Sequence, residues 1–298
     1  MHLFAKAAAR VGGMFAGSSA RSAEAEESGA EAAPTPRVVV VAHRGGSASA
    51  PENTLAAIRR GIALGVDLVE LDVQRTWDGK LVIVHDRSLA RTTDAERVFP
   101  RGAPWNVRDV TYADVRTLDA GSWKGPEFAG ERIPTLAEAI RALRLSRSGL
   151  LLELKAPELY PGIEAEIVAQ LTEFRGYVRS AVAAGRLAVH SFDAESMRRF
   201  RRLAPTVPVG LLGAPDLADL PELSTWVNEI HPNHRSVDAD YVAQVHRLGM
   251  ACVVWTVDTR ADLIRALDLG VDGIITNHPD DLQALLLERS HRPAAPAA

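Results

Sequence analysis

The stretch VDLVELDVQRTWDGKLVIVHD, residues 66–86, decides the fold of this chain. Its opening VDLVELDV and its later LVIV are both apolar runs typical of buried strands. The short segment RTWDGK between them cannot hold the crossover helix that parallel strands need, and its DG dipeptide is a strong hairpin signal. We therefore predict that Gln74–Val84 is a ribbon that rises beyond the first strand and returns, which brings His85 back near Asp72.

From Arg37 onward, short β-branched apolar runs alternate with segments of helical spacing, the pattern of βαβ units and a parallel sheet. Nine candidate strands follow from this pattern: Val38–Ala42, Val66–Val73, Leu81–Val84, Leu150–Leu154, Leu187–His190, Val207–Leu212, Val227–Ile230, Ala251–Trp255 and Gly273–Thr276. The third belongs to the ribbon, so eight parallel strands remain. An α/β fold of the TIM (β/α)8 barrel type is predicted.

The chain divides into a barrel with flanking and inserted segments. Residues 1–36 resemble either a disordered extension or a secretory signal, which leaves the compartment open between cytoplasmic and secreted. The barrel is expected over 37–290, followed by a flexible tail, 291–298. Residues 87–132 exceed the usual connection of about two to six residues. They are expected to form an inserted cap over the barrel mouth that shapes the leaving-group pocket, or else a loop packed by its own aromatic residues.

Composition excludes several classes of function. The formal net charge is −4 and the basic residues are scattered, so nucleic acid is not an expected partner. The sequence has no apolar run of the length that crosses a bilayer. Cys252 is the single cysteine, which rules out an intrachain disulfide and a cysteine-based metal cluster. A soluble enzyme acting on a small molecule fits these numbers, with its oligomeric state open.

Three carboxylates are predicted to converge inside the barrel. Residues two apart in a strand face the same way, so Glu70 and Asp72 share one face, as do Glu153 and Lys155. Helices cover the outer face of such a barrel, so these charges point into the lumen. Oxygen ligands of this kind suit Mg²⁺ or Ca²⁺, and zinc is less favoured because no compact His/Cys cluster is evident. Taken singly, each carboxylate could instead be a strand-end charge or an ion-pair partner.

Two histidines and two cations complete this set. His43 ends the first strand and His85 ends the ribbon, so both can reach the barrel mouth as a general base and a general acid. Arg44 and Lys155 can hold phosphate oxygens and oppose the charge of the transition state. Together with a divalent metal, these groups match the requirements for cleaving a phosphate ester.

Two further strand ends are candidates for substrate contact. His190 closes a barrel strand and can line the mouth, although an isolated histidine is more often structural. Trp255 also closes an apolar strand and can cover the carbon skeleton of a substrate. Simple core packing is the alternative for Trp255.

In order and combination, eight motifs of the chain resemble the glycerophosphodiester phosphodiesterase family. They are AHRG (Ala42–Gly45), PENT (Pro51–Thr54), ELDVQRTWDG (Glu70–Gly79), VHD (Val84–Asp86), LELK (Leu152–Lys155), HSF (His190–Phe192), WTVD (Trp255–Asp258) and DGIITNHP (Asp272–Pro279). The resemblance implies a metal-dependent TIM barrel with a small insertion after the second histidine. It departs slightly from the family pattern in HSF, where many relatives have a glutamine, and in WTVD, where many end in asparagine.

The resemblance also implies roles for residues. A divalent metal is implied at Glu70, Asp72 and Glu153, with Glu52 of PENT as a further acidic position near it. Acid/base roles fall to the two histidines and phosphate contacts to the two cations named above. The implied reaction releases sn-glycerol 3-phosphate and an alcohol such as choline or ethanolamine, after attack by the glycerol 2-hydroxyl or by water.

Two other functions compete with this one. A related phospholipase D-like barrel that cleaves lysophospholipid or sphingomyelin would share the site but need a wider, more apolar mouth with exposed membrane-binding loops. A catalytically silent binding protein would keep the phosphate pocket, but it should lack a histidine or a metal carboxylate, and the chain has the full set.

Overall fold

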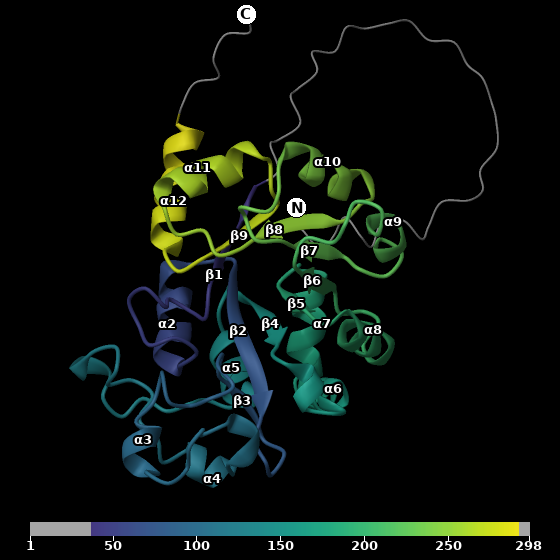
Figure 1. Cartoon of the computed structure of the whole chain (residues 1–298). Coiled ribbons are helices and arrows are strands. Elements are labelled where there is room, and N and C mark those ends of the chain that lie inside the picture. The colour runs from purple at the N-terminus through teal and green to yellow at the C-terminus, as the bar shows by residue number, and fades with distance from the viewer. Residues whose placement is uncertain (1–36, 292–298) are drawn as a thin grey trace, which may run out of the picture.

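The predicted barrel is present in the computed structural model, which describes residues 37–291 (Figure 1). Eight parallel strands form it: β1 (Val39–Ala42), β2 (Leu68–Arg75), β4 (Gly149–Leu154), β5 (Leu187–Ser191), β6 (Val209–Leu212), β7 (Glu229–His231), β8 (Ala251–Val254) and β9 (Gly273–Thr276). The sheet closes because β1 pairs with both β9 and β2. The predicted segment 1–36 and the predicted tail beyond His291 lie outside the described residues.

The ribbon is also confirmed. Strand β3 (Leu81–Ile83) runs antiparallel to β2, with Val73 opposite Ile83 and Arg75 opposite Leu81. The Val84 amide then donates a hydrogen bond to the Asp72 carbonyl at 2.9 Å, which returns the chain to the rim of the barrel. The residue after Val84 is His85, so this hydrogen bond brings that histidine to the mouth.

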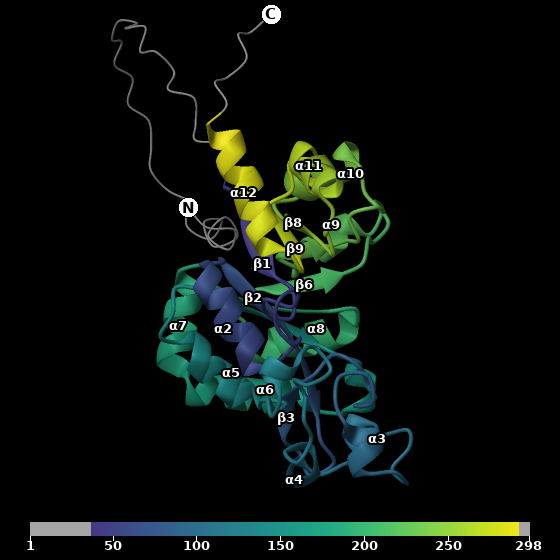
Figure 2. The same cartoon turned by 90° about the vertical axis from the view of Figure 1, so that its left-hand side faces the viewer.

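Helices surround the outside of the barrel, as Figures 1 and 2 show. They are α2 (Leu55–Leu64), α5 (Leu136–Leu143), α6 (Ile163–Glu173), α7 (Arg175–Ala183), α8 (Ala194–Leu203), α9 (Leu220–Leu223), α10 (Ala239–Arg247), α11 (Arg260–Asp268) and α12 (Pro279–Ser290). Their starts follow local chemistry. A reciprocal capping box of Thr135 and Glu138 opens α5, and the Asp193 carboxylate accepts from the Ser196 amide to open α8. Within residues 37–291, no helix has the length and apolarity needed to cross a bilayer.

Alternation along the strands separates two cores. Val69, Leu71 and Val73 of β2 face outward and pack in the large core beneath the helices. Inside the barrel, six apolar side chains form a floor: Val41, Leu68, Leu151, Ala188, Val253 and Ile275. We call this set the lumen floor.

A polar layer lies next to the lumen floor toward the carboxyl ends of the strands. Strand register aligns Asp72 with Glu153, Glu153 with His190, His190 with Gly210, and Gly210 with Glu229. The four side chains in this row are buried. Together with buried Glu70, they form what we call the polar layer.

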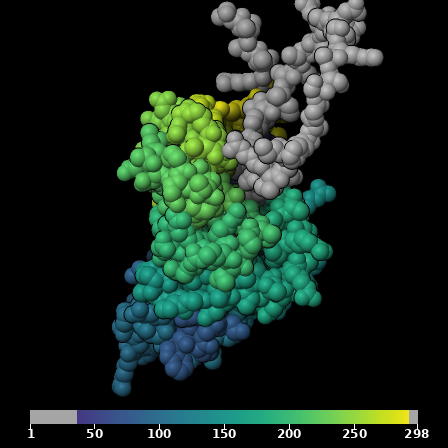
Figure 3. Space-filling model, turned by 90° about the vertical axis from the view of Figure 1, so that its right-hand side faces the viewer, coloured from purple at the N-terminus to yellow at the C-terminus, as the bar shows by residue number. Residues whose placement is uncertain are grey.

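The insertion forms a small subdomain with its own core. Its helices are α3 (Ala95–Val98) and α4 (Tyr112–Val115), with 3-10 turns at Val107–Asp109 and Pro126–Phe128. Apolar side chains of this segment pack with Val82 and Val84 of the ribbon. Figure 2 shows α3 and α4 beyond β3, and Figure 3 shows the blue end of the molecule extending away from the yellow-green C-terminal part. The insertion therefore packs on the ribbon.

Candidate active site

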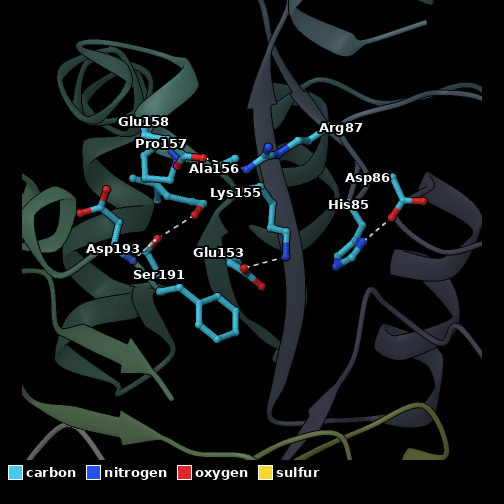
Figure 4. Close-up of a pocket in the computed structure, with 12 residues that line it drawn as sticks. His85, Asp86, Arg87, Glu153, Lys155, Ala156, Pro157, Glu158, Ser191 and Asp193 are labelled. Atoms are coloured by element: carbon cyan, nitrogen blue, oxygen red, sulfur yellow. Dashed lines mark hydrogen bonds and ion pairs between the residues drawn. The ribbon is translucent and has the colours of Figure 1, made fainter. Parts of the chain in front are cut away.

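Two adjoining cavities open at the carboxyl ends of the barrel strands. The inner cavity measures about 210 Å³ and is lined by His43, Arg44, Glu70, His85, Glu153, Lys155, His190, Phe192, Leu212, Trp255, Thr256 and Ile275. The outer cavity, about 760 Å³, is lined by His85–Arg87, Glu153–Glu158 and Ser191–Asp193 (Figure 4). Eight of the ten predicted site residues line at least one of these cavities. The insertion contributes only Arg87, because residues 88–132 line neither.

Glu70, Glu153 and His190 form a compact buried cluster. Each offers one ligand atom, and these atoms all lie within 4.8 Å of one another. Glu70 Oε1 and His190 Nε2 are both buried without a hydrogen-bond partner. Two carboxylates and an imidazole suit a divalent cation, and unpaired buried polar atoms are otherwise costly. The residues therefore fit a metal centre.

The pKa values of two carboxyl groups in the polar layer support a metal centre at this cluster. Burial raises the pKa of Glu153 to about 8, with Asp72 adding repulsion. Burial, again with repulsion from neighbouring carboxylates, raises the pKa of Glu70 well above its usual range. Crowded buried carboxylates are disfavoured as anions unless positive charge lies among them. A divalent cation bound at this cluster would supply that charge.

Asp72, the third predicted ligand, lies beside the cluster between two cations. Its Oδ2 accepts from Asn53 Nδ2 at 2.7 Å and lies 3.6 Å from Arg44 Nε, while its Oδ1 lies 3.7 Å from Lys155 Nζ. Burial acts to raise the pKa of Asp72, but attraction to Lys155, His85 and Arg44 outweighs it and lowers this pKa. Asp72 thus stays ionised more readily than Glu70 or Glu153.

His43 is oriented by a neutral amide. Its Nδ1 lies 2.7 Å from Asn277 Oδ1, and Asn277 Nδ2 donates to Asp258 Oδ2 at 2.7 Å. The Asp258 contact makes Asn277 Oδ1 the acceptor, so His43 carries its proton on Nδ1 and leaves Nε2 with a lone pair. Burial, assisted by the charge of Arg44, lowers the pKa of His43 to about 4. His43 is therefore neutral near pH 7.

His85 is oriented by a carboxylate instead. Its Nδ1 lies 2.6 Å from Asp86 Oδ1 (Figure 4), and Asp86 Oδ2 in turn accepts from Arg91 Nε. Burial lowers the pKa of His85, whereas Asp72 and Asp86 act in the opposite direction. A carboxylate at Nδ1 stabilises the imidazolium form, which suits a proton donor.

Arg44 and Lys155 bring positive charge to the inner cavity. The Arg44 backbone adopts a left-handed φ of 52° and its amide donates to Glu70 Oε2 at 2.8 Å. Lys155 Nζ donates to Glu153 Oε1 at 2.8 Å, as Figure 4 shows. The next residue, Gly45, has φ 88°, and a Cβ there would lie 2.6 Å from Ala57 atoms. This tight turn packs Gly45 against helix α2, next to Arg44.

Glu52 lines neither cavity and is instead paired with two arginines. Its Oε1 accepts from Arg44 Nη1 at 2.8 Å, and Arg91 contacts both of its carboxylate oxygens at 2.7 and 2.9 Å. Arg91 also contacts Asp86, so one insertion residue ties Glu52 to the His85 loop. Sequence reasoning missed Arg91, because nothing local marks it among the many arginines of the chain.

An aromatic wall closes one side of the inner cavity. Trp255 and Phe192 meet edge to face, with ring centroids 5.7 Å apart and an interplanar angle of 87°. Trp255 Nε1 donates to the His231 carbonyl at 2.7 Å, which holds the indole in place. His190, predicted to contact substrate, is only 1% exposed and lies in the carboxylate cluster. Phe192 is the last residue of the HSF motif, and the sequence pattern alone did not predict its place in this wall.

Comparisons with known proteins agree with this geometry. The model of the glycerophosphoryl diester phosphodiesterase family matches residues 43–281. A glycerophosphodiester phosphodiesterase of Caldanaerobacter subterraneus subsp. tengcongensis is 36% identical over 249 residues, which is 83% of this chain and 96% of that protein. One from Bacillus subtilis is 34% identical over 258 residues, 82% of this chain and 85% of its own length. The structure of an Oleispira antarctica phosphodiesterase in complex with the product sn-glycerol-3-phosphate matches with a TM-score of 0.71 at 30% identity, covering 83% of this chain and 96% of that one.

Proposed function

The chain belongs to the glycerophosphoryl diester phosphodiesterase family, and we propose that its barrel mouth hydrolyses glycerophosphodiesters to sn-glycerol 3-phosphate and an alcohol. One observation carries the assignment to this site. A single cavity is lined by two histidines, two cations and the buried cluster of Glu70, Glu153 and His190. These are the groups that phosphodiester cleavage needs.

The cluster is proposed to hold a divalent metal, with Asp72 as a further carboxylate beside it. The carboxylates of Glu70, Glu153 and Asp72 support Ca²⁺ or Mg²⁺, both of which prefer oxygen ligands. A bound divalent cation polarises the phosphoryl group and offsets its charge.

Arg44 and Lys155 are proposed to bind the phosphodiester oxygens. Both line the inner cavity, and both are already held by carboxylates, Arg44 by Glu52 and Lys155 by Glu153. A positively charged side chain that is held in place before substrate binds can stabilise the negative charge of the transition state without further reorganisation. Trp255 and Phe192 offer an apolar wall for the glycerol carbons.

We assign His43 as the general base and His85 as the general acid. His43 is neutral near pH 7 and is held in the tautomer that leaves the Nε2 lone pair free. It accepts the proton of the attacking group, which is either a water, giving sn-glycerol 3-phosphate directly, or the glycerol 2-hydroxyl, giving a cyclic phosphodiester that a water then opens to sn-glycerol 3-phosphate. Asp86 stabilises a protonated His85, which gives its Nε2 proton to the leaving alcohol. The outer cavity, which His85 also lines, provides the exit for that alcohol.

The test measures sn-glycerol 3-phosphate released from glycerophosphocholine and glycerophosphoethanolamine by purified protein. Assays run with EDTA, and with Ca²⁺ or Mg²⁺ restored after EDTA. We expect chelator-sensitive release that one of the two metals restores. His291→Ala, an exposed histidine far along the chain, is the matched control for His43→Ala.

Two results would overturn the proposal. Cleavage of lysophosphatidylcholine or sphingomyelin without cleavage of either glycerophosphodiester would move the chain to the phospholipase class. No turnover of any diester by metal-loaded protein would favour a binding role.

A further inference from the structure

Buried hydrogen bonds join Glu229 and His231 of β7 to His190 of the candidate metal cluster, and the mechanism above gives Glu229 and His231 no role. His231 Nε2 lies 2.9 Å from Glu229 Oε2, and His231 Nδ1 lies 2.8 Å from His190 Nδ1. The two imidazoles meet edge to face with centroids 4.8 Å apart. Glu229, His231 and His190 are 2%, 0% and 1% exposed. Burying three linked polar side chains is costly, because each needs a hydrogen-bond partner where no water is available. Their presence therefore indicates a functional role.

The hydrogen bonds of these three side chains determine where their protons lie. A carboxylate can only accept a hydrogen bond, so His231 carries a proton on Nε2 and donates it to Glu229 Oε2. A neutral imidazole has one N–H, which leaves His231 Nδ1 as an acceptor. His190 must then donate from Nδ1, and its Nε2 keeps a lone pair. That Nε2 is buried and has no hydrogen-bond partner, while His190 offers a ligand atom to the cluster with Glu70 and Glu153.

Strand β6 leaves the space that these three side chains occupy. Register places Gly210 between His190 on one side and Glu229 on the other. A Cβ at position 210 would lie 3.0 Å from His231 Nε2 and 3.3 Å from the His190 Cβ. Contacts this close would push the His231 ring away from its partners. The glycine therefore allows His231, which lies two residues after Glu229 on β7, to reach across β6.

We propose that His190 Nε2 is a nitrogen ligand of the divalent cation, and that Glu229 and His231 are positioning residues that hold His190 in the tautomer exposing this lone pair. The inference rests on the proposed function only in placing a cation at the Glu70 and Glu153 carboxylates. Metal-bound histidines commonly donate their second ring N–H to another acceptor, which fixes ring and tautomer. Here that acceptor is a second histidine backed by a carboxylate.

A nitrogen ligand changes which cations the site should favour. Imidazole adds affinity for borderline transition metals, whereas Ca²⁺ and Mg²⁺ prefer an all-oxygen shell. The mixed set of two carboxylates and one imidazole therefore predicts that Mn²⁺ and Co²⁺ bind more tightly than Mg²⁺. If His190 Nδ1 instead accepted from His231 Nδ1, the N–H of His190 would lie on Nε2, point at the cluster and oppose cation binding.

The test uses Mn²⁺ alone as the probe. Pulsed electron paramagnetic resonance of the Mn²⁺-loaded protein should show ¹⁴N modulation from a coordinated imidazole. His190→Gln should abolish this modulation, while His234→Gln, at a buried histidine outside this chain of hydrogen bonds, should retain it. Glu229→Gln should weaken Mn²⁺ binding by about 10- to 100-fold in calorimetry, the usual effect of losing a group that orients a metal ligand.

Failures of this inference and of the proposed function are separable. Bound Mn²⁺ without ¹⁴N modulation, or modulation lost in His43→Gln or His85→Gln but kept in His190→Gln, would overturn the inference even if diesters are hydrolysed. Modulation from His190 in a protein that hydrolyses no diester would overturn the function and leave the inference standing. If His190→Gln fails to fold, the wild-type spectrum and the Glu229→Gln calorimetry still decide the matter.

Discussion

The lumen floor and the polar layer share strands β2, β4 and β5, yet they have opposite effects on the fold. Leu68 and Glu70 are two residues apart on β2, and Leu151 and Glu153 are two residues apart on β4. The floor residues are apolar and fully packed, and their burial stabilises the barrel. In the polar layer, burial and then mutual repulsion raise the pKa values of Glu70 and Glu153. A single strand such as β2 thus carries a leucine that stabilises the barrel and, two residues further on, a carboxylate of the candidate site.

The largest loss of activity without loss of stability should come from substituting the two histidines at the barrel mouth. His43→Ala and His85→Ala should each lower kcat/KM by about 10²- to 10⁴-fold, because general acid/base catalysis contributes that much. The melting temperature should change little, since neither residue belongs to the lumen floor. Steady-state assays and thermal melts on the same samples check this. Near wild-type rates in either variant would remove that histidine from the mechanism.

Leu151→Ala should show the reverse pattern. Truncating this buried floor residue should lower the free energy of unfolding by about 2–5 kcal/mol, while the folded fraction keeps its kcat. Urea titration followed by assay of the folded protein measures both quantities. Leu145→Ala, at a leucine that is 88% exposed, is the matched control and should change stability by no more than about 0.5 kcal/mol. Equal losses at the two leucines would contradict the role given to the floor.

The polar layer predicts a pH dependence of stability in chelated protein. Glu153 has a folded pKa of about 8, above its usual value, so the folded state holds this proton more tightly than the unfolded state. Stability should therefore fall as pH rises from about 5 to about 8, and added divalent metal should reduce this fall. Thermal melts in EDTA, with and without excess metal, measure it. Glu153→Gln should flatten the EDTA curve; an unchanged slope would mean that another group dominates.

Arg91→Gln should give the smallest effect, because Arg91 acts through other residues. It holds Glu52 and Asp86 but lines neither cavity, and its side chain is nearly half exposed. We expect a loss of about tenfold in kcat/KM, equivalent to about 1.4 kcal/mol, with the acidic limb of the pH profile shifted. Arg97→Gln, at an exposed arginine of the insertion that pairs with Asp94, should leave both unchanged. A loss confined to KM would instead place Arg91 in substrate binding.

Local sequence patterns were sufficient to predict the barrel and the inward face of each charged strand. Alternation alone places Glu70, Asp72 and Glu153 inside, and the DG turn predicts the ribbon that returns His85. Two features depend on contacts between distant segments and could not be predicted. Strand register sets His190 beside Glu153, and the fold of the insertion brings Arg91 to Asp86. The insertion packs on Val82 and Val84 of the ribbon, and its Arg91 and Lys124 contact Asp86 and the Ser47 carbonyl at the mouth. Its role as a cap that shapes the leaving-group pocket stays a prediction.

Closure of the barrel by β1 and β9 has a consequence for newly made protein. His43 takes its orientation from Asn277, which follows 234 residues later in the chain. At about 5–20 residues per second, a ribosome needs about 12–47 s to travel between them. Throughout that interval His43 lacks the amide that sets its tautomer. Diesterase turnover therefore reports that translation has delivered the final strand, and a chain cut short before β9 should be silent however well its earlier strands have paired.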